Sequence, residues 1–559
     1  RVGRTGSDAE ALLRAAAVLG TSFEPHIVAG LLQLPVPAAA RRCEQLLATR
    51  LVVVAGRDYE FVHDLVHEVL YETTPMPTRL AYHRAAADLL ADRPEAVAAH
   101  AAAGEDWTRA ARAWLLAAEQ AASRYAAADA ETLLGRALAA AEQAGDVELR
   151  ARVHVARGRV REILMSFAAA EQDLLAAVDL AHAAGDPRLE MRALRWLGGD
   201  VPVALGRPAT TCLPPLHAAL RIAESLGDRS MEAAVLARLA VLAVNQLDFV
   251  DGIALGERAL TAARAAGDDH SLAFALDGAK AAYAYLGDIA RLEPIVTELE
   301  QLVRRSGDLF LLHWAIFESA FIPMARAQWA PATARIEEAL AVGRRSGWTS
   351  YEGWFDAHLG WIARLQGRHG DAIELGRRSL IERAGQPHTW WDAFARAMLA
   401  STLAETGATQ EATALLEGGL RYADHGDAAA YRLRCIAALA RLSGSAEQLA
   451  EADALLAAVT VPAGQAWLHG VDVYLDLAAA HLAHGAADRA HAVIAPALAA
   501  ATLTGSIPAL AQTSLVQARC LAALGDAAGA GELAVIAHKL ARDNGMAYVA
   551  DQAAAVRRG

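Results

Sequence analysis

Two histidines and two carboxylates gather in one short segment of the chain, HDLVHE at residues 63–68. His63 and His67 lie four residues apart, so on a helix they share one face, where two imidazoles can ligate zinc. The order with Asp64 and Glu68 differs from HExxH, however, and no third ligand is apparent. The segment therefore favours a packed structural helix, with a zinc site as the minor alternative.

Side chains for covalent or acid–base catalysis are not assembled in the sequence. There is no GxSxG nucleophile elbow. Neighbouring carboxylates such as Glu337 and Glu338 point apart on a helix and are expected to be solvated. The four cysteines are Cys43, Cys212, Cys435 and Cys520. Because no two of them form a CxxC pair, we expect small buried thiols in a reducing compartment. We expect no enzyme activity in this chain.

A phosphate-binding loop is also missing from the sequence. Lys280 and Lys539 are the two lysines of the chain, and they follow Ala279 and His538, where GxxxxGK(S/T) requires glycine. We therefore expect neither a nucleotide cofactor nor a metal in this chain. The formal net charge of -13 also argues against a broad surface for DNA or RNA.

The helices that carry these side chains follow a repeat. Residues 349–385 read as one complete helix-turn-helix unit of the tetratricopeptide (TPR) type. Leu359 and Gly360 stand where the two helices touch, Gly367 stands in the turn, and Ala372 stands where the second helix packs back. The unit is about 40 residues long, which is longer than the usual length of about 34.

Two glycine series repeat this period along the chain. The glycines expected just after the second helix of each pair are Gly145, Gly185, Gly227, Gly267, Gly307, Gly347, Gly385, Gly426, Gly464, Gly505 and Gly545. A glycine there suits the left-handed end of a helix, and the Asp that often follows can cap the next helix. The turns inside repeats are marked by Gly287, Gly367, Gly407, Gly485 and Gly525. The expected fold is all-α, with about eleven TPR-like helix pairs in a right-handed superhelical solenoid over residues 107–559.

Residues 1–75 differ from the repeats that follow. Three helical segments precede two extended ones, LVVVA and YEFVH, which a turn at residues 56–58 joins into a β-hairpin. This order predicts a small winged-helix module over residues 1–75. Residues 76–106 are then expected to form a helical linker to the solenoid.

Three segments of this region carry a family resemblance: ALLRAAAVLGTSFEPHIVAGLL, LLATRLVVVAGRDYEFVHDLVHEVLYETTP and RLAYHRAAADLLAD. Over residues 8–103 the chain resembles the winged-helix segment and linker of STAND-class signal-transduction ATPases, in particular the large ATP-binding regulators of the LuxR type. The resemblance implies a nucleotide-binding domain before this segment, a sensor or partner-binding role for the repeats, and an output domain at one end. Because the chain starts without methionine, we expect a fragment of a longer protein.

The resemblance also sets the expected partners. ATP and Mg²⁺ are expected only in an upstream domain of the parent, which the winged-helix module would contact. DNA would be bound only through a domain that is not present here. No membrane contact is expected, because Pro496, Gly505 and Pro508 interrupt the longest uncharged run, and the protein is expected to be cytoplasmic.

Two functions follow from these expectations. The leading hypothesis is the sensor and effector-binding arm of an ATP-dependent bacterial transcriptional regulator. The alternative is a regulatory scaffold arm of a nucleotidyl cyclase or a Ser/Thr kinase, which would bind protein only.

Aromatic residues indicate where a ligand would bind. Seven of the eleven tryptophans fall between residues 314 and 391. Counted from Leu359 and Gly360, the concave face is expected to carry Trp314, Phe317, Glu318, Phe321, Trp354, His358, Trp361, Arg364 and Phe394. Trp314, Trp354 and Phe394 are 40 residues apart and should stack along one wall. Such a face suits a small-molecule effector, a peptide or a protein. The alternative is that the rings only fill thick interfaces between repeats.

Overall fold

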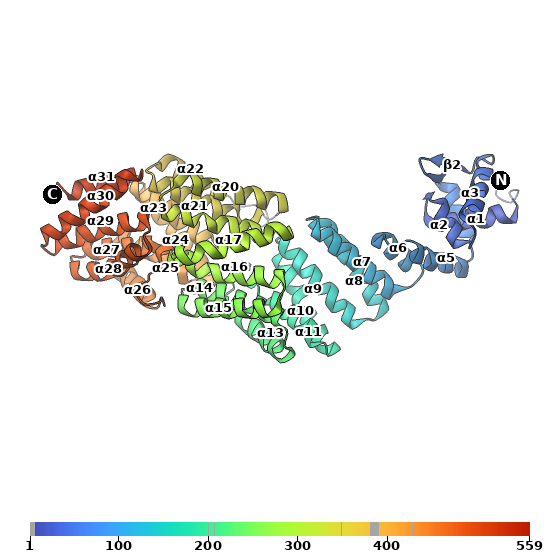
Figure 1. Cartoon of the computed structure of the whole chain (residues 1–559), viewed down its shortest axis with the longest axis horizontal. Coiled ribbons are helices and arrows are strands. Elements are labelled where there is room, and N and C mark those ends of the chain that lie inside the picture. The colour runs from blue at the N-terminus through green and yellow to red at the C-terminus, as the bar shows by residue number, and fades with distance from the viewer. Residues whose placement is uncertain are drawn as a thin grey trace. The chain divides into compact units, whose positions relative to one another are not determined.

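A computed structural model describes residues 6–199, 201–205, 207–347, 349–380, 391–426 and 429–558. Backbone contacts divide the chain into two compact units, residues 1–190 and 191–559. Both units consist mainly of paired helices (Figure 1). The boundaries predicted at residues 75 and 106 stay predictions.

Unit 1 begins with helices and a small sheet. The elements are α1 (Ser7–Leu19), β1 (Ser22–Phe23), α2 (Pro25–Leu31), α3 (Val36–Leu47), β2 (Val52–Ala55), β3 (Asp58–Phe61) and α4 (Asp64–Thr73). The predicted hairpin is confirmed, because β2 and β3 pair antiparallel with Val52 opposite Phe61. The two-residue strand β1 was not predicted, and it pairs with the other edge of β3.

The helices of this region pack on the sheet around one core. Leu12, Leu46, Phe23, Phe61 and Leu70 are buried together there. The rest of unit 1 is helical, with α5 (Met76–Leu89), α6 (Pro94–Ala103), α7 (Trp107–Ser123), α8 (Ala127–Ala144), α9 (Val147–Ile163), α10 (Phe167–Ala184) and the start of α11 (Pro187–Leu197).

Unit 2 continues as helix pairs. Its first elements are the rest of α11, α12 (Val201–Ala204), η2 (Ala209–Cys212), α13 (Leu213–Leu226), α14 (Arg229–Asn245), α15 (Phe249–Ala266), α16 (Asp269–Leu286), α17 (Ile289–Ser306), α18 (Leu309–Ser319), α19 (Phe321–Ala325) and α20 (Trp329–Ser346). These are followed by η3 (Thr349–Tyr351), α21 (Glu352–Leu365), α22 (His369–Ser379), α23 (Asp392–Glu405), α24 (Thr409–Gly426), α25 (Ala429–Ser443) and α26 (Ala446–Ala457). The last are η4 (Leu468–Gly470), α27 (Val471–Ala483), α28 (Ala487–Thr504), α29 (Ile507–Ala523), α30 (Ala527–Asp543) and α31 (Ala547–Val556). The predicted all-α, TPR-like solenoid is confirmed.

The caps of these helices come from the sequence pattern. Nine of the eleven glycines of the first series take left-handed backbone angles, with φ of 66° at Gly145 and 64° at Gly227. Gly426 is the last residue of α24 rather than the residue after it. The aspartate after such a glycine caps the next helix, as when Asp146 accepts the amide of Leu149 and Asp228 that of Met231. Gly385 lies outside the described residues. The repeat therefore fixes both ends of the turn between pairs.

Two places depart from the regular repeat. Gly464 does not end a helix as predicted, because α26 already stops at Ala457. Residues 458–470, here called the strap, form an irregular connection that ends in η4. The helix predicted before Trp329 is also divided into α18 and α19. Pro323 cannot donate a backbone hydrogen bond, and its ring crowds the turn before it, which accounts for this break.

Late repeats of unit 2 pack on earlier ones. Helix α29 contacts α19, and α31 contacts α21. The indole Nε1 of Trp329 donates to the carbonyl of Asn544 at 2.7 Å. Repeats about 200 residues apart in sequence therefore share contacts, whereas a simple solenoid joins only neighbouring repeats.

Two further expectations concern cysteine and the membrane. All four cysteines are buried, as predicted, and none forms a disulfide within the part of the chain that the structure describes. Among the residues that the structure describes, no helix is both long and apolar enough to cross a bilayer.

One glycine inside α8 and one directly after it provide a matched test of the capping argument. Gly145 has a φ of 66°, whereas Gly135 lies inside the helix with open space where a Cβ would stand. We expect Gly145→Ala to lower the free energy of unfolding by about 1 kcal/mol, because an L-residue is strained in the left-handed region. Gly135→Ala should raise it by about 0.5–1 kcal/mol, because alanine favours a helix interior. Urea unfolding followed by circular dichroism measures both, and effects of the same sign would contradict the assignment.

Candidate functional site

Five of the nine predicted groove residues meet the strap inside unit 2. Helices α16, α18, α19, α21, α23 and α25 direct side chains toward it. We call the following residues the inner cluster: Tyr285, Phe317, Phe321, Trp354, His358, Phe394, Arg434, Trp467 and His469. Phe317, Trp354, His358 and Phe394 are each at most 1% exposed. The predicted concave face is therefore buried, and the strap covers part of it.

The aromatic wall differs in part from the predicted one. The rings of Trp354 and Phe394 lie 4.4 Å apart, as their 40-residue spacing predicts. Trp314 instead contacts Tyr351 at 5.0 Å and Phe355 at 5.7 Å. Phe317, one turn further along α18, is the residue of that repeat that reaches Trp354, at 6.3 Å.

The strap crosses from one set of repeats to another. The Thr460 amide donates to the carbonyl of Leu247 at 3.0 Å, and its carbonyl accepts from the Phe249 amide at 2.9 Å. The side-chain amide of Gln465 donates to Asp288 at 3.3 Å. Leu468 lies so close to Gly287 that a Cβ there would stand 3.1 Å from its side chain. Glycine at this position is needed both for this approach and for its φ of 71°.

His469 of the strap enters the inner cluster as a flat ring. Its imidazole stacks on Tyr285 at 4.5 Å with an interplanar angle of 10°, and on Phe394 at 5.5 Å with 12°. Gly470 follows directly, and a Cβ there would overlap the ring of Trp467. Glycine is therefore required at position 470, where the chain turns next to the Trp467 ring.

Hydrogen bonds connect His469 to two repeats in a fixed order. Arg434 can only donate, so its Nη2, at 2.9 Å, makes Nδ1 of His469 an acceptor. Nε2 of His469 then carries the proton and donates to Nε2 of His358 at 3.1 Å. Nδ1 of His358 donates in turn to the carbonyl of Trp354 at 2.8 Å. Both imidazoles are neutral in this arrangement. Burial agrees with this, since it lowers the pKa of His358 to about 3 and that of His469 well below its usual value.

Arg434 is a buried cation held mainly by rings. It is 3% exposed, and its guanidinium lies 4.9 Å from the Phe394 ring and 4.7 Å from the Trp467 ring. Nη2 also donates to the backbone carbonyl of His469. Burial lowers the pKa of Arg434 to about 10, against the opposing charge of Asp472. Its Nη1 is buried and has no hydrogen-bond partner among the residues that the structure describes.

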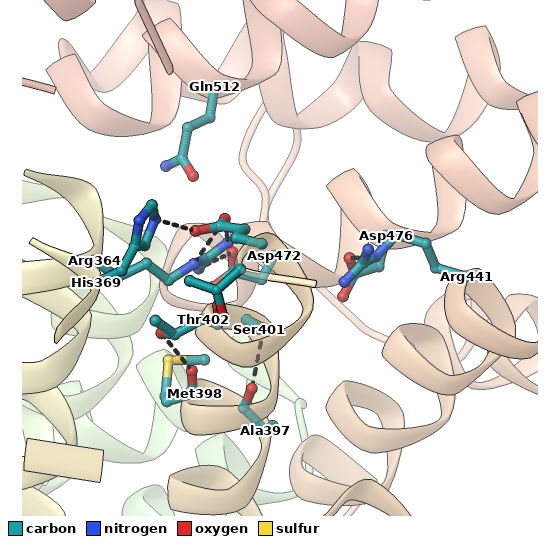
Figure 2. A network of polar contacts seen from close by, with 12 residues as sticks. Arg364, His369, Ala397, Met398, Ser401, Thr402, Arg441, Asp472, Asp476 and Gln512 are labelled. Atoms are coloured by element: carbon teal, nitrogen blue, oxygen red, sulfur yellow. Dashed lines mark hydrogen bonds and ion pairs between the residues drawn. The ribbon is translucent and has the colours of Figure 1, made fainter. Parts of the chain in front are cut away.

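A second buried network lies beside the inner cluster (Figure 2). Arg364 donates to Glu405 at 2.8 Å and to Asp472 at 3.0 Å, and His369 lies 3.1 Å from the other Glu405 oxygen. Burial opposes the charge on Arg364, but the two carboxylates outweigh it and raise the pKa of Arg364. Burial would raise the pKa of Asp472, yet the charge of Arg364, its hydrogen bond and the charge of Arg434 lower it. The network ties α21, α23 and α27 together.

Glu318 belongs to a third polar group. Its carboxylate lies 2.5 Å from Nζ of Lys280, which is also 2.7 Å from Asp277. Lys280 is 3% exposed. Burial opposes its charge, but the two carboxylates raise the pKa of Lys280 above its usual range. This lysine joins α16 to α18 and is not available to a ligand.

Five of the nine predicted groove residues therefore belong to the inner cluster: Phe317, Phe321, Trp354, His358 and Phe394. Trp314 contacts Tyr351, and Glu318 pairs with Lys280. Arg364 pairs with Asp472 of α27, and Trp361 packs on a cluster formed mainly by α29, α30 and α31. A binding role for these nine residues stays a prediction.

The partners that complete the cluster were missed at the sequence level. Arg434, Trp467 and His469 are the main ones. One signal was visible, since VPAGQAWLHG interrupts the helical period with one proline and two glycines.

The histidine pair near the N-terminus has a structural contact. Nε2 of His67 lies 2.9 Å from the carbonyl oxygen of Ala17 in α1. No group of three His, Cys, Asp or Glu side chains suited to a metal occurs in the described part of the chain.

Comparisons with known proteins give distant similarities. No family model matches the chain, and no curated protein matches it. A STAND protein with a tetratricopeptide repeat sensor from Pyrococcus horikoshii aligns at 14% identity and a TM-score of 0.38. That alignment covers 90% of this chain and 65% of the other, so this chain spans less than two thirds of that protein.

Two further solved structures are similar over most of the chain. The APC/C hetero-tetramer Cut9–Hcn1 aligns at 13% identity and a TM-score of 0.45, over 86% of this chain and 94% of the other. A Rap protein in complex with Competence and Sporulation Factor aligns at 12% identity and a TM-score of 0.39, over 71% and 98%.

The neutral imidazoles predict a pH dependence of stability. The pKa of His358 is about 3 in the folded chain and about 6.5 when unfolded, so below pH 6.5 the unfolded chain binds a proton that the folded chain cannot. The contribution of each such histidine to the free energy of unfolding is therefore fully present above pH 6.5. It falls toward pH 3 by about 1.4 kcal/mol per pH unit. We expect His358→Gln to flatten this slope in urea unfolding, followed by tryptophan fluorescence. His217→Gln, at an exposed position of α13, should leave the slope unchanged. Equal slopes in both variants would contradict the assignment.

Substitutions of Arg364 and Arg377 compare a buried ion pair with an exposed one. Arg364→Met leaves Asp472 and Glu405 buried without their cation, so we expect a loss of about 3–5 kcal/mol in the free energy of unfolding. Arg377 pairs with Glu411 at 3.0 Å, but its side chain is 61% exposed. Arg377→Met should cost less than about 1 kcal/mol. Comparable losses in urea unfolding would show that the Arg364 network is not a buried one.

Proposed function

We propose that this chain is the sensor and partner-binding arm of an ATP-dependent bacterial transcriptional regulator of the STAND class. In this proposal ATP and Mg²⁺ bind in an upstream domain of the parent, and DNA binds through another of its domains. The resemblance over residues 8–103 supports this assignment. So does the order of helices and hairpin in residues 7–73, which matches the order expected of the winged-helix segment.

The observation that carries the sensor role is the convergence of five repeats on one strap. Tyr285, Phe317, His358, Phe394 and Arg434 come from five successive repeats, and all lie around one strap. In a solenoid, each repeat normally contacts only its neighbours. A ligand at this cluster would therefore act on several repeats at once.

Such a cluster has the properties that a switch needs. A ligand shifts a conformational equilibrium only when it binds one state more tightly than the other. Here the strap distinguishes two states, because it either occupies the cluster or leaves it. Release of the strap by a partner would change the contacts of residues 247–288 with residues 460–468.

The winged-helix module offers a separate surface for the ATPase domain of the parent. On α4, Leu65 is 68% exposed and Val69 is 49% exposed, and these residues lie one helical turn apart. Met76, at the start of α5, is 50% exposed. Exposed apolar side chains on one helix face, as at Leu65 and Val69, suit a docking surface. The proposed contact is with the nucleotide-binding domain.

Transcription in the intact parent tests the proposal. We expect deletion of residues 107–559 to make reporter transcription independent of the effector, because the arm that holds the regulator inactive is removed. A parent with Arg377→Met, an exposed position, serves as the control and should respond normally. Unchanged transcription in the deletion strain would contradict the regulator assignment. If the parent instead carries a cyclase or kinase domain, the arm would belong to that enzyme.

A further inference from the structure

The strap is attached at two places, at Thr460 and at the buried residues Ala466, Trp467 and Leu468, with an exposed stretch between them. Two backbone hydrogen bonds hold Thr460 to the turn before α15, and its hydroxyl also donates to Asp248. Beyond these, Gln465, Trp467, Leu468 and His469 supply the side-chain contacts. Between the two groups, Ala463 and Gly464 are exposed to solvent. The strap can therefore leave the cluster without unwinding a helix pair.

The face under the strap is suited to a flat group. Tyr285 and Phe394 stack on the two sides of the His469 imidazole, at interplanar angles of 10° and 12°. The Phe321 ring meets the edge of the same imidazole at 5.5 Å. These rings belong to three repeats and would remain in place when the strap leaves.

The strap satisfies Arg434 only in part. Its Nη2 donates to both the ring and the carbonyl of His469, whereas its Nη1 is buried without a partner in the described part of the chain. An unsatisfied buried donor costs about 1–3 kcal/mol. A carboxylate would accept from both nitrogens of the guanidinium in the bidentate geometry that arginine favours. The face under the strap is thus better matched to an acidic ligand than to the strap itself.

We propose that the strap is the internal occupant of a peptide-binding site. The ligand of this site is a segment of a partner protein that places a flat side chain between Tyr285 and Phe394 and a carboxylate on Arg434. This inference rests on the proposed partner-binding role and adds the chemistry of the partner. Binding of the peptide releases residues 458–470 from residues 247–288, and so couples the site to distant repeats.

A peptide cut from the strap tests the proposal. Its sequence is PAGQAWLH, residues 462–469. Its terminal carboxylate takes the place of the His469 carbonyl that Arg434 now contacts. The labelled peptide is made as a free acid and as an amide, and its binding to the full chain with Trp467→Ala and His469→Ala is measured by fluorescence anisotropy. We expect the acid to bind about tenfold more tightly than the amide, a difference of about 1.4 kcal/mol.

Two controls define the site. In the loosened chain, Arg434→Gln should remove the preference for the acid, because the guanidinium that distinguishes acid from amide is gone. The chain with its natural strap should bind the acid more weakly, in proportion to the fraction of molecules with an open strap. Circular dichroism verifies that each variant is folded.

A second form of the protein covers the case in which the loosened chain does not fold. A protease site is inserted between the exposed residues Ala463 and Gly464 and is cut after folding, so that no residue of the cluster changes. The cut chain should bind the acid more tightly than the uncut chain. The proposal is overturned if a folded loosened or cut chain binds neither peptide, or binds acid and amide equally well with and without Arg434. Transcription in the parent is measured separately, so the regulator assignment can fail while the peptide site stands, and the reverse.

Discussion

The organisation of unit 2 depends on one buried cation and the ring that accepts its hydrogen bond. Arg434 is surrounded by aromatic faces and donates a hydrogen bond to His469. His469 donates in turn to His358, and His358 donates to a backbone carbonyl of α21. A buried guanidinium is costly unless its donors are satisfied. The strap supplies the acceptors for Nη2, and it lies against repeats that are more than 200 residues earlier in the sequence.

This arrangement changes what the solenoid can do. A solenoid stabilised only by neighbouring contacts responds locally to a ligand, because each interface is independent of the others. Here the strap, the Arg364 network and the contact of Trp329 with Asn544 join distant repeats. Buried ionic groups are a weak source of stability but can favour one arrangement over its competitors. The same interactions that close unit 2 are therefore the ones through which a ligand would act.

Periodic features were predictable from the sequence, and long-range ones were not. The glycine series, the aspartate caps and the β-hairpin depend on local backbone preferences, so the all-α repeat could be derived without a structure. The pairing of Trp354 with Phe394 followed from their spacing. By contrast, Trp314 contacts Tyr351 and Glu318 pairs with Lys280, because these partners in neighbouring repeats lie closer to them. His469 could not be placed, since no period links the strap to α16, α21 and α25.

A double-mutant cycle between Arg434→Gln and His358→Gln tests most directly whether the strap transmits energy between repeats. The two side chains belong to different repeats, and His469 bonds both. We expect a coupling energy of about 1 kcal/mol or more in urea unfolding, because loss of either partner disturbs the imidazole that they share. The coupling should vanish in a chain with His469→Ala. Additive effects, within about 0.3–0.5 kcal/mol, would contradict the account.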